Sequence, residues 1–205
     1  MAPHCRTARA FLHCSSTGVY EAADGSPQSE TDPLGDNHRV MMPTYSISKI
    51  AAEAVVRTTA RIFGVPTTIA RLNVPYGDTG GWPAFHLALI LAGRAVPVRG
   101  DVPNRFNPIH EDDIVGMVPA LLSAASTPAT TVNWGGSVPV SVEEWCTYLG
   151  ELTGLEPAFE PTAATIDSVM VDLSRLHSLV GATQVPWREG MRRMVEARHP
   201  ELLKS

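Results

Sequence analysis

The chain has 205 residues and a mass of 22.0 kDa, which is enough for one ordinary α/β domain and too little for several independent cores. Apolar residues make up 44% of it and charged residues 18%, so it can bury a hydrophobic core and is not disordered by composition. The formal net charge of -5 leaves no basic footprint for nucleic acid, and that class of partner is excluded.

Neither a membrane span nor an export signal is predicted. The most apolar stretch, residues 82–92, is far shorter than the ~20 residues that cross a bilayer, and it contains His86. Polar residues between positions 4 and 9 interrupt any apolar signal region. The cysteines are odd in number and form no Cys-x-x-Cys pair, which favours free thiols in a reducing cytoplasm. They are Cys5, Cys14 and Cys146.

In chain order, the first half predicts a strand, a long loop, a helix and a second strand. Residues 10–13 form an apolar strand that runs into a polar turn at residues 14–18, and residues 21–42 form a loop of the length that is usually functional. Helical spacing then extends from Pro43 to Phe63, with Gly64 as the C-cap. The β-branched run at residues 67–72 is a second strand. This order is typical of a parallel α/β sheet, whose sites lie at the carboxyl ends of its strands.

The second half predicts a smaller, mixed α/β lobe, and the chain divides into residues 1–77 and 78–205. Its expected elements are helices at residues 83–92, 112–125, 142–152 and 187–199 and a strand at residues 130–134. Ser141 and Glu144 have the spacing of a capping box. Asp112 and Asp113 beside His110 suit a helix N-terminus better than a metal site, so no metal is expected.

Tyr45-Ser46-Ile47-Ser48-Lys49 places a phenol and an amine one turn apart on the same helix face. A free tyrosine ionises near pH ~10, so acid-base chemistry at neutral pH requires a nearby positive charge, which Lys49 can provide. An incidental pair on a solvated helix face is the alternative. Because lysine occurs only at positions 49 and 204, chance would produce this spacing in only ~4% of shuffled sequences.

Four motifs occur in a fixed order: Cys-Ser-Ser-Thr-Gly-Val-Tyr at 14–20, Tyr-Ser-Ile-Ser-Lys at 45–49, Arg-Leu-Asn-Val-Pro-Tyr-Gly at 71–77 and His-Glu-Asp-Asp-Ile at 110–114. Together they resemble the extended short-chain dehydrogenase/reductases, specifically the NAD-dependent epimerase/dehydratase family. The resemblance implies the C-terminal part of a doubly wound parallel Rossmann sheet plus a small mixed α/β substrate lobe. Residues 1–77 would be a partial NAD(P)-binding core with the catalytic residues. Residues 78–205 would be mainly the substrate lobe, with segments that return to the core.

The resemblance also implies roles for individual residues. Tyr45 would be the acid/base, and Lys49 would hold the nicotinamide ribose of NAD or NADP and favour the ionised phenol. Ser16 would hydrogen-bond the same substrate oxygen as Tyr45, so that two donors face the charge that develops there. A serine that only satisfies turn backbone is the alternative for Ser16. Cys14 and Leu72 would line the nicotinamide site.

Two more residues would contact the substrate. Asn73 matches the family's substrate-side asparagine. Arg105 resembles the arginine that binds diphosphate in members acting on nucleotide sugars, but the segment from Arg105 to His110 carries one extra residue. A surface arginine is the alternative reading of Arg105.

No G-x-G-x-x-G or close variant occurs in the sequence, so the loop that would cradle a dinucleotide pyrophosphate is absent from it. By the resemblance, the chain begins at about the fifth strand of the family's sheet and lacks its catalytic asparagine. The strand at Phe11 would then expose an edge that normally lies inside a sheet. We expect a truncated protein, and little NAD binding by these residues alone.

Three functions follow as alternatives. The first is an NAD(P)-dependent epimerase/dehydratase-type oxidoreductase acting on a sugar-like hydroxyl or ketone, such as a nucleotide sugar. The second is an NAD(P)-dependent reductase or dehydrogenase of a non-sugar substrate, and the third is a degenerate, non-catalytic accessory chain. A small-molecule substrate is expected, and the resemblance implies a homodimer through the helix that carries Tyr45 and Lys49.

Overall fold

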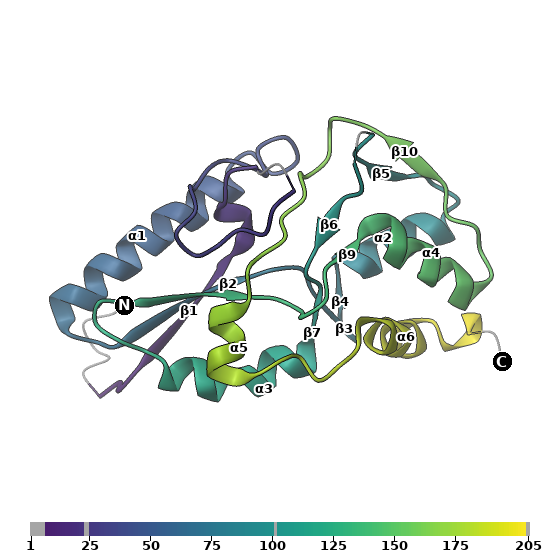
Figure 1. Ribbon diagram of the computed structural model, residues 1–205. Coiled ribbons are helices and arrows are strands. Elements are labelled where there is room, and N and C mark those ends of the chain that lie inside the picture. The colour runs from purple at the N-terminus through teal and green to yellow at the C-terminus, as the bar shows by residue number, and fades with distance from the viewer. Residues whose placement is uncertain (1–6, 23–24, 101, 204–205) are drawn as a thin grey trace.

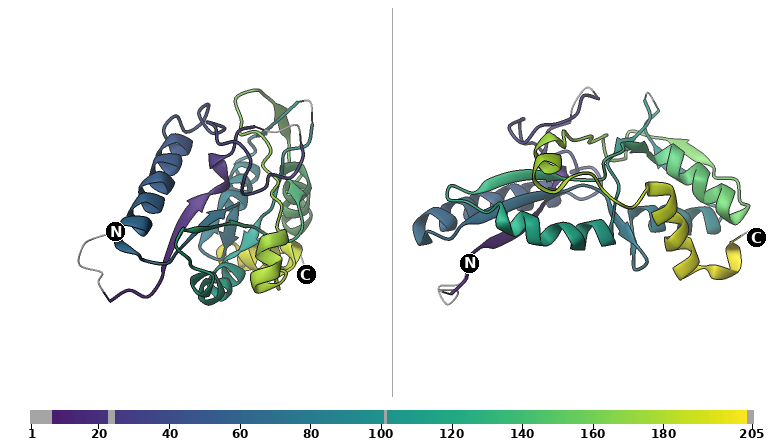
Figure 2. Two further views of the ribbon diagram at one scale, coloured as in Figure 1. Left: turned by 60° about the vertical axis from the view of Figure 1, so that its left-hand side comes forward. Right: turned by 60° about the horizontal axis from the view of Figure 1, so that its bottom comes forward.

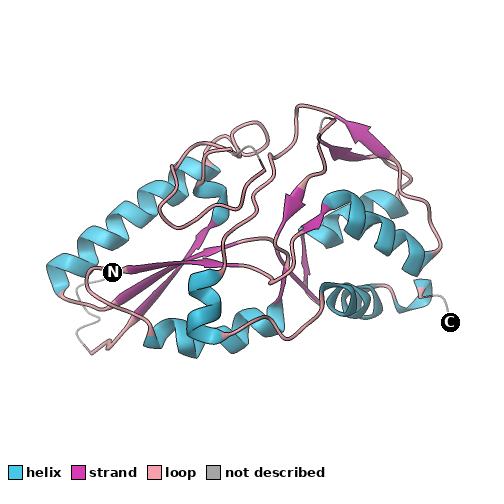
Figure 3. Cartoon of the chain, viewed as in Figure 1, coloured by secondary structure: helices cyan, strands magenta, loops and turns pink. Residues whose placement is uncertain are grey.

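The structure is a computed structural model and describes residues 7–22, 25–100 and 102–203. Its helices, labelled in Figure 1, are α1 (Tyr45–Phe63), α2 (Trp82–Leu91), α3 (Glu111–Ser123), α4 (Val142–Thr153), α5 (Ser174–Val180) and α6 (Trp187–Arg198). Its strands are β1 (Phe11–Ser16), β2 (Thr67–Leu72), β3 (Pro75–Gly77), β4 (Gly80–Gly81), β5 (Val96–Val98), β6 (Arg105–Phe106), β7 (Ile109–His110), β8 (Thr130–Trp134), β9 (Val140–Ser141) and β10 (Phe159–Pro161). Short 3-10 helices cover Thr17–Val19 and Pro200–Leu202. Helices and strands are mixed along the whole chain, which confirms the α/β class (Figure 3).

A parallel sheet in the order β1-β2-β8 forms the centre of the first lobe of the molecule. Ser16 pairs with Leu72, and Leu72 pairs with Trp134, so the strands finish level with one another at their carboxyl ends. β2 is buried along almost its whole length, as expected for the central strand of a sheet that is covered on both faces. α1 covers one face and α3 the other (Figures 1 and 2). Among the described strands, β1 is paired on one side only.

α1 ends where the sequence predicts. Gly64 adopts the left-handed conformation with φ 63°, and its N–H donates to the carbonyl oxygen of Ala60. The face toward the sheet is buried and carries two polar side chains among small and apolar ones: Ser46, Glu53, Val56 and Ala60. The opposite face leaves large apolar side chains exposed: Ile47, Val55 and Ile62.

A second, smaller lobe is formed by α2, α4 and α6, which pack together beside short strands (Figure 1). Trp145 on α4 is fully buried, and its Nε1 donates to Nδ1 of His86 on α2 at 2.9 Å. Trp82 meets the rings of Trp145 and Phe106 edge-on, at centroid distances of 5.8 and 5.0 Å. These contacts give the lobe an aromatic core that joins α2 to α4. At the start of α4 the predicted capping box of Ser141 and Glu144 is confirmed, with both hydrogen bonds present.

Several sequence-based boundaries are wrong. β1 continues to Ser16 because its ladder with β2 extends as far as Leu72, so the turn begins at Thr17, three residues later than the predicted turn at residues 14–18. α3 begins at Glu111 and ends at Ser123, earlier at both ends than predicted. The sequence does not predict α5, which is short and mostly exposed and so lacks a clear apolar period.

Of the cysteines, Cys14 is exposed and Cys146 is buried in α4, and both are free thiols. Burial raises the pKa of Cys146, so this thiol is inert and packs as a small apolar side chain. Cys5 lies outside the described residues. Within the described ranges, no helix combines the length and the apolar character needed to cross a membrane.

Candidate functional site

A cavity of about 490 Å³ opens where the carboxyl ends of β1 and β2 meet the first turns of α1. The second lobe closes its far side, and the loop before α1 covers part of it. From the sheet and α1 it is lined by Cys14, Ser15, Ser16, Thr17, Tyr45, Lys49, Leu72, Asn73, Val74 and Pro75. The loop contributes His38, Met41 and Met42, and the second lobe contributes Trp82, Phe85, Phe106, Ile166 and Val169. The structure thus brings together six of the seven residues that the sequence nominates for the site.

Tyr45 is the first residue of α1, and Lys49 follows one turn later on the same face. The Lys49 ammonium lies 5.8 Å from the centroid of the Tyr45 ring. It also donates to the carbonyl oxygen of Cys14 at 3.4 Å, which holds it against the end of β1. The positive charge of Lys49 therefore lies over the face of the Tyr45 ring. The structure thus brings the phenol and the ammonium together at the cavity.

Ser16 is the last residue of β1 and the N-cap of the short helix that follows, and its backbone is extended rather than turned. Its Oγ accepts a hydrogen bond from the backbone N–H of Gly18 at 3.1 Å. Among the described residues no acceptor is placed for the hydroxyl proton, and the side chain lines the cavity. Ser16 can therefore donate a hydrogen bond to a bound molecule.

Asn73 is almost fully buried at the end of β2, and its amide is largely committed to the protein. Its Oδ1 accepts from the backbone N–H groups of Val74 and Asn107, at 2.8 and 3.0 Å. Its Nδ2 donates to the carbonyl oxygen of Val169 at 2.9 Å. Only one Nδ2 hydrogen is left, so contact with a substrate is limited to a single donated bond.

Cys14 and Leu72 lie at the ends of neighbouring strands, where the sequence predicts the nicotinamide site. Burial raises the pKa of the Cys14 thiol, and the opposing effect of Lys49 is smaller. At neutral pH the thiol is protonated, and it serves as a wall of the cavity rather than as a nucleophile.

Arg105 is the one nominated residue that the structure does not bring to the cavity. It is exposed on β6, its backbone N–H donates to Ser168 Oγ at 2.9 Å, and its side chain is not part of the lining. Its neighbour Phe106 faces the cavity instead. Contact between Arg105 and a substrate stays a prediction.

His38 also lines the cavity, although the sequence does not predict it as a site residue. Its imidazole stacks on the Tyr45 ring, with centroids 5.3 Å apart and planes 29° apart. Burial lowers the pKa of His38, so the ring is neutral at pH 7, and its buried Nδ1 has no partner among the described residues. It packs against Gly18, where a Cβ would come within 2.6 Å of the imidazole. The signal in the sequence is only a histidine in a polar loop, which periodicity cannot distinguish from a solvent-exposed one.

The segment from His110 to Asp113 caps a helix. His110 Nδ1 accepts from the backbone N–H of Asp112 at 3.1 Å. The carboxylate of Asp113 accepts from the backbone N–H groups of Gln184 and Val185, at 2.8 and 3.1 Å. These bonds explain the acidic run. His110 caps the N-terminus of α3, and Asp113 holds the loop that precedes α6.

The residues of the cavity fit the nicotinamide end of NAD. Lys49 keeps two hydrogens beyond its bond to Cys14, which suits it to hold the hydroxyls of a ribose beside Tyr45. Cys14 and Leu72 offer apolar surface at the strand ends for a flat ring. For the pyrophosphate the sequence holds no glycine-rich loop, so the fit extends to one end of the cofactor.

Comparison with known proteins agrees with this geometry. The family model described as the NAD dependent epimerase/dehydratase family matches residues 1–135. The chain is 25% identical over 206 residues to dTDP-D-glucose 4,6-dehydratase of Mus musculus, with 91% of this chain and 54% of that protein covered.

Solved structures are similar as well. UDP-glucose 4-epimerase from Thermotoga maritima has a TM-score of 0.77 at 23% identity, covering 95% of this chain and 64% of that one. MoeE5 in complex with UDP-glucose and NAD has a TM-score of 0.77 at 26% identity, covering 93% and 65%. The chain thus spans about half the length of the curated relative and less than two thirds of these structures. Because the family model matches well over half of the chain, the chain belongs to the NAD-dependent epimerase/dehydratase family.

Proposed function

We propose that the chain forms the catalytic and substrate-facing part of an NAD-dependent epimerase or dehydratase that acts on a nucleotide sugar. The observation that carries this proposal is the convergence of Ser16, Tyr45 and Lys49 on one cavity at the carboxyl ends of parallel strands. Relatives named for UDP-glucose and dTDP-glucose, two of them in complex with NAD, support the substrate class and the cofactor.

Tyr45 holds and moves the proton. With the Lys49 ammonium 5.8 Å from its ring centroid, Tyr45 can take up the proton of a substrate hydroxyl as a general base. In the reverse direction the phenol donates that proton to a carbonyl oxygen. NAD, when bound, would supply the redox chemistry that side chains cannot.

Ser16 and Lys49 do the positioning. The Ser16 hydroxyl, oriented by the bond from Gly18 N, donates to the same substrate oxygen as Tyr45 and stabilises the negative charge on it. Lys49, anchored on the carbonyl of Cys14, holds its charge beside Tyr45. Both groups are in place before a substrate binds, which reduces the reorganisation needed in the transition state.

A non-sugar hydroxyl or ketone is the second candidate substrate, and one observation favours it. Lys49 is the one lysine or arginine among the described residues that line the cavity, and the wall from the second lobe is apolar: Trp82, Phe85, Phe106, Ile166 and Val169. A diphosphate is recognised best by arginine, and Arg105 lies outside this lining.

Two further parts of the proposal concern the whole protein. A homodimer through α1 is supported by its exposed apolar face, where Val55 and Ile62 are 59% and 68% exposed. A cytoplasmic location is supported by the two free thiols, Cys14 and Cys146.

The experiment that tests the proposed function is a substrate panel with the full-length protein and NAD. UDP-glucose, UDP-glucuronic acid and dTDP-glucose are incubated in turn, and the products are identified by NMR. We expect one of them to be converted, with a change at position 4 of the sugar. Conversion of uncharged hydroxyl or ketone compounds, with no reaction of any nucleotide sugar, would select the second candidate and overturn the first.

A further inference from the structure

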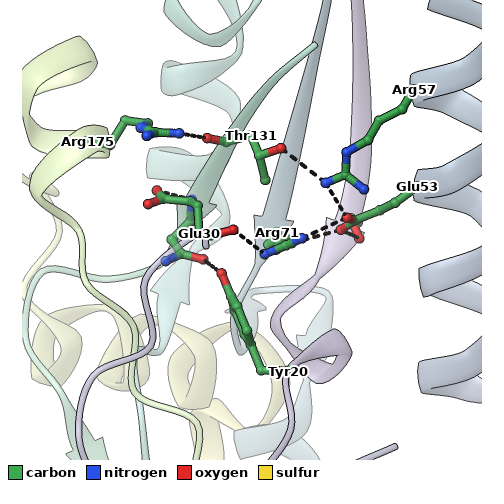
Figure 4. A network of polar contacts seen from close by, with 9 residues as sticks. Tyr20, Glu30, Glu53, Arg57, Arg71, Thr131 and Arg175 are labelled. Atoms are coloured by element: carbon green, nitrogen blue, oxygen red, sulfur yellow. Dashed lines mark hydrogen bonds and ion pairs between the residues drawn. The ribbon is translucent and has the colours of Figure 1, made fainter. Parts of the chain in front are cut away.

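A buried ion pair joins α1 to the sheet directly beneath the site. Glu53 on α1 is fully buried, and its carboxylate accepts from Nε and Nη2 of Arg71 on β2, both at 2.9 Å. The same carboxylate accepts from the hydroxyl of Ser15 on β1 at 2.6 Å. Arg57, one turn further along α1, donates to Glu53 at 2.9 Å. Glu53 therefore connects α1 with two neighbouring strands at once. Figure 4 shows its contacts with Arg71 and Arg57.

On its other side, Arg71 reaches the loop that precedes α1. Its guanidinium lies 4.8 Å from the centroid of the Tyr20 ring, and its Nη1 donates to the carbonyl oxygen of Glu30 at 3.1 Å. The Tyr20 hydroxyl donates to Asn133 on β8, and the backbone N–H of Asn133 donates to the Glu30 carboxylate. Figure 4 shows Arg71 at the centre of this network, between Glu53 and Tyr20. All three strands of the sheet, α1 and the loop thus share one set of polar contacts.

The charges in this network are well compensated. Burial alone would raise the pKa of Glu53, but hydrogen bonds and charge from Arg71, with help from Ser15 and Arg57, hold it below its ordinary value. Burial opposes ionisation of Arg71 in the same way, and Glu53 outweighs it, so the pKa of Arg71 is raised. Both side chains are therefore ionised at neutral pH. A bidentate arginine–carboxylate contact of this kind fixes both distance and orientation.

Each member of the pair lies next to a group of the proposed site. Glu53 follows Lys49 by one turn of α1 and Tyr45 by two turns, Ser15 precedes Ser16, and Arg71 precedes Leu72. A shift of α1 along the sheet would move the phenol and the ammonium together relative to Ser16. The contacts of Glu53 with both strands oppose that shift.

We infer that the Glu53–Arg71 ion pair, together with Ser15, is a positioning device that sets the distance between Tyr45 and Lys49 on α1 and Ser16 on β1. The inference rests on the proposed function for its kinetic consequence. Stability alone does not require a charged pair here, because apolar side chains of similar volume are often as stabilising at buried positions.

The test replaces both charges at once, so that neither is left buried and unpaired. We expect the Glu53→Met/Arg71→Met variant of the full-length protein to fold and melt near the parent temperature. Its kcat should fall by about tenfold to 100-fold, while KM for the nucleotide sugar changes by less than about threefold. The NMR resonance of the Tyr45 ring, measured with isotope-labelled tyrosine and assigned by its loss in Tyr45→Phe, should shift or broaden. A folded variant with parental kcat and an unchanged Tyr45 resonance overturns the inference.

Ser15→Ala decides the question if the double variant does not fold, because it removes one hydrogen bond and leaves the ion pair in place. We expect it to fold, with a lower kcat and a shifted Tyr45 resonance, and no change in either would overturn the inference. The control is Arg193→Met, which removes a 2.8 Å ion pair with Asp112 away from the site. An equal effect in this control would also overturn it. If the parent turns over none of the panel substrates, the proposed function fails, and the Tyr45 resonance still tests the positioning.

Discussion

Tyr45, Lys49 and Ser16 are each held by contacts within the protein that precede any binding event. His38 stacks on the Tyr45 ring, the Cys14 carbonyl accepts from Lys49, and Gly18 N donates to Ser16 Oγ. These contacts leave the phenol oxygen, ammonium hydrogens and the Ser16 proton for a bound molecule. At the scale of single residues, these contacts would preorganise the proposed site for one oxygen atom that gains and loses a proton.

Ser16→Ala tests the second donor. We expect kcat to fall by about 100-fold, because a preorganised hydrogen bond to the developing oxyanion is lost. The melting temperature should change little, because the only bond that the Ser16 side chain makes to the described protein is the one accepted from Gly18. Steady-state kinetics and thermal melts measure the two effects. If kcat stays near the parental value, Ser16 acts only as the N-cap of the short helix after β1.

At the scale of elements, α1 is fastened to the sheet by a polar network as well as by apolar packing. Removing one partner of the buried ion pair should therefore reduce the stability of the fold. We expect Arg71→Met to lower the free energy of unfolding by about 3 kcal/mol, because the Glu53 carboxylate stays buried with fewer partners. Urea denaturation measures this, and Glu53→Met/Arg71→Met should recover most of the loss. Equal losses in the single and double variants would show that apolar packing at these positions matters more than charge.

The packing of α2 on α4 makes the second lobe sensitive to acid. Burial lowers the pKa of His86 from 6.5 to about 4, and its Nδ1 accepts from Trp145, so the folded state holds the neutral imidazole. As pH falls through 6.5, the unfolded chain takes up a proton that the folded chain does not. Stability should therefore be lost between pH 6.5 and about 4, by up to roughly 3 kcal/mol.

His86→Asn tests this, because its Oδ1 can replace Nδ1 as the acceptor for Trp145 and does not titrate. Urea denaturation at pH 7 and pH 4.5 should show a smaller pH dependence in this variant than in the parent. His177→Asn, at an exposed position on α5, is the control and should match the parent. If His86→Asn keeps the parental pH dependence, another group causes it.

The sequence predicts those elements that local rules determine. Gly64 ends α1 and Ser141 caps α4 because both depend on neighbouring residues alone. The role of His38 could not be predicted, because it depends on a loop folding back onto Gly18 and Tyr45. The role of Glu53 could not be predicted either. Its position in the helix does not distinguish it from a surface residue, and only the pairing of β1 with β2 brings Ser15 and Arg71 to it.

At the scale of the whole molecule, the cavity draws its lining from the parallel sheet with α1 and from the second lobe. Figure 1 shows these two parts of the molecule side by side. The sheet supplies the polar groups at strand ends, and the second lobe supplies an aromatic wall. β8 pairs with β2 in the first sheet, although in the sequence it lies within the second half of the chain. The lobes are therefore joined by several crossings of the chain, which favours a cavity of fixed shape.

The exposed face of α1 predicts the oligomeric state. We expect the full-length protein to be a dimer by light scattering, and we expect Val55→Glu/Ile62→Glu to be a monomer, because both charges would be buried in the interface. Val115→Glu, at a position on α3 that is 70% exposed, is the control and should leave the dimer intact. A double variant that remains dimeric would place the interface elsewhere.

Turnover by Tyr45→Phe, in the full-length protein with NAD and the converted nucleotide sugar, decides whether this cavity is an active site. The substitution removes one oxygen atom, keeps the ring that stacks on His38, and should leave the fold and NAD binding unchanged. We predict that kcat falls by at least about 100-fold, as expected for the loss of a general acid/base. Turnover within a few-fold of the parent would show that Tyr45 does not carry the proton and that the chemistry takes place elsewhere.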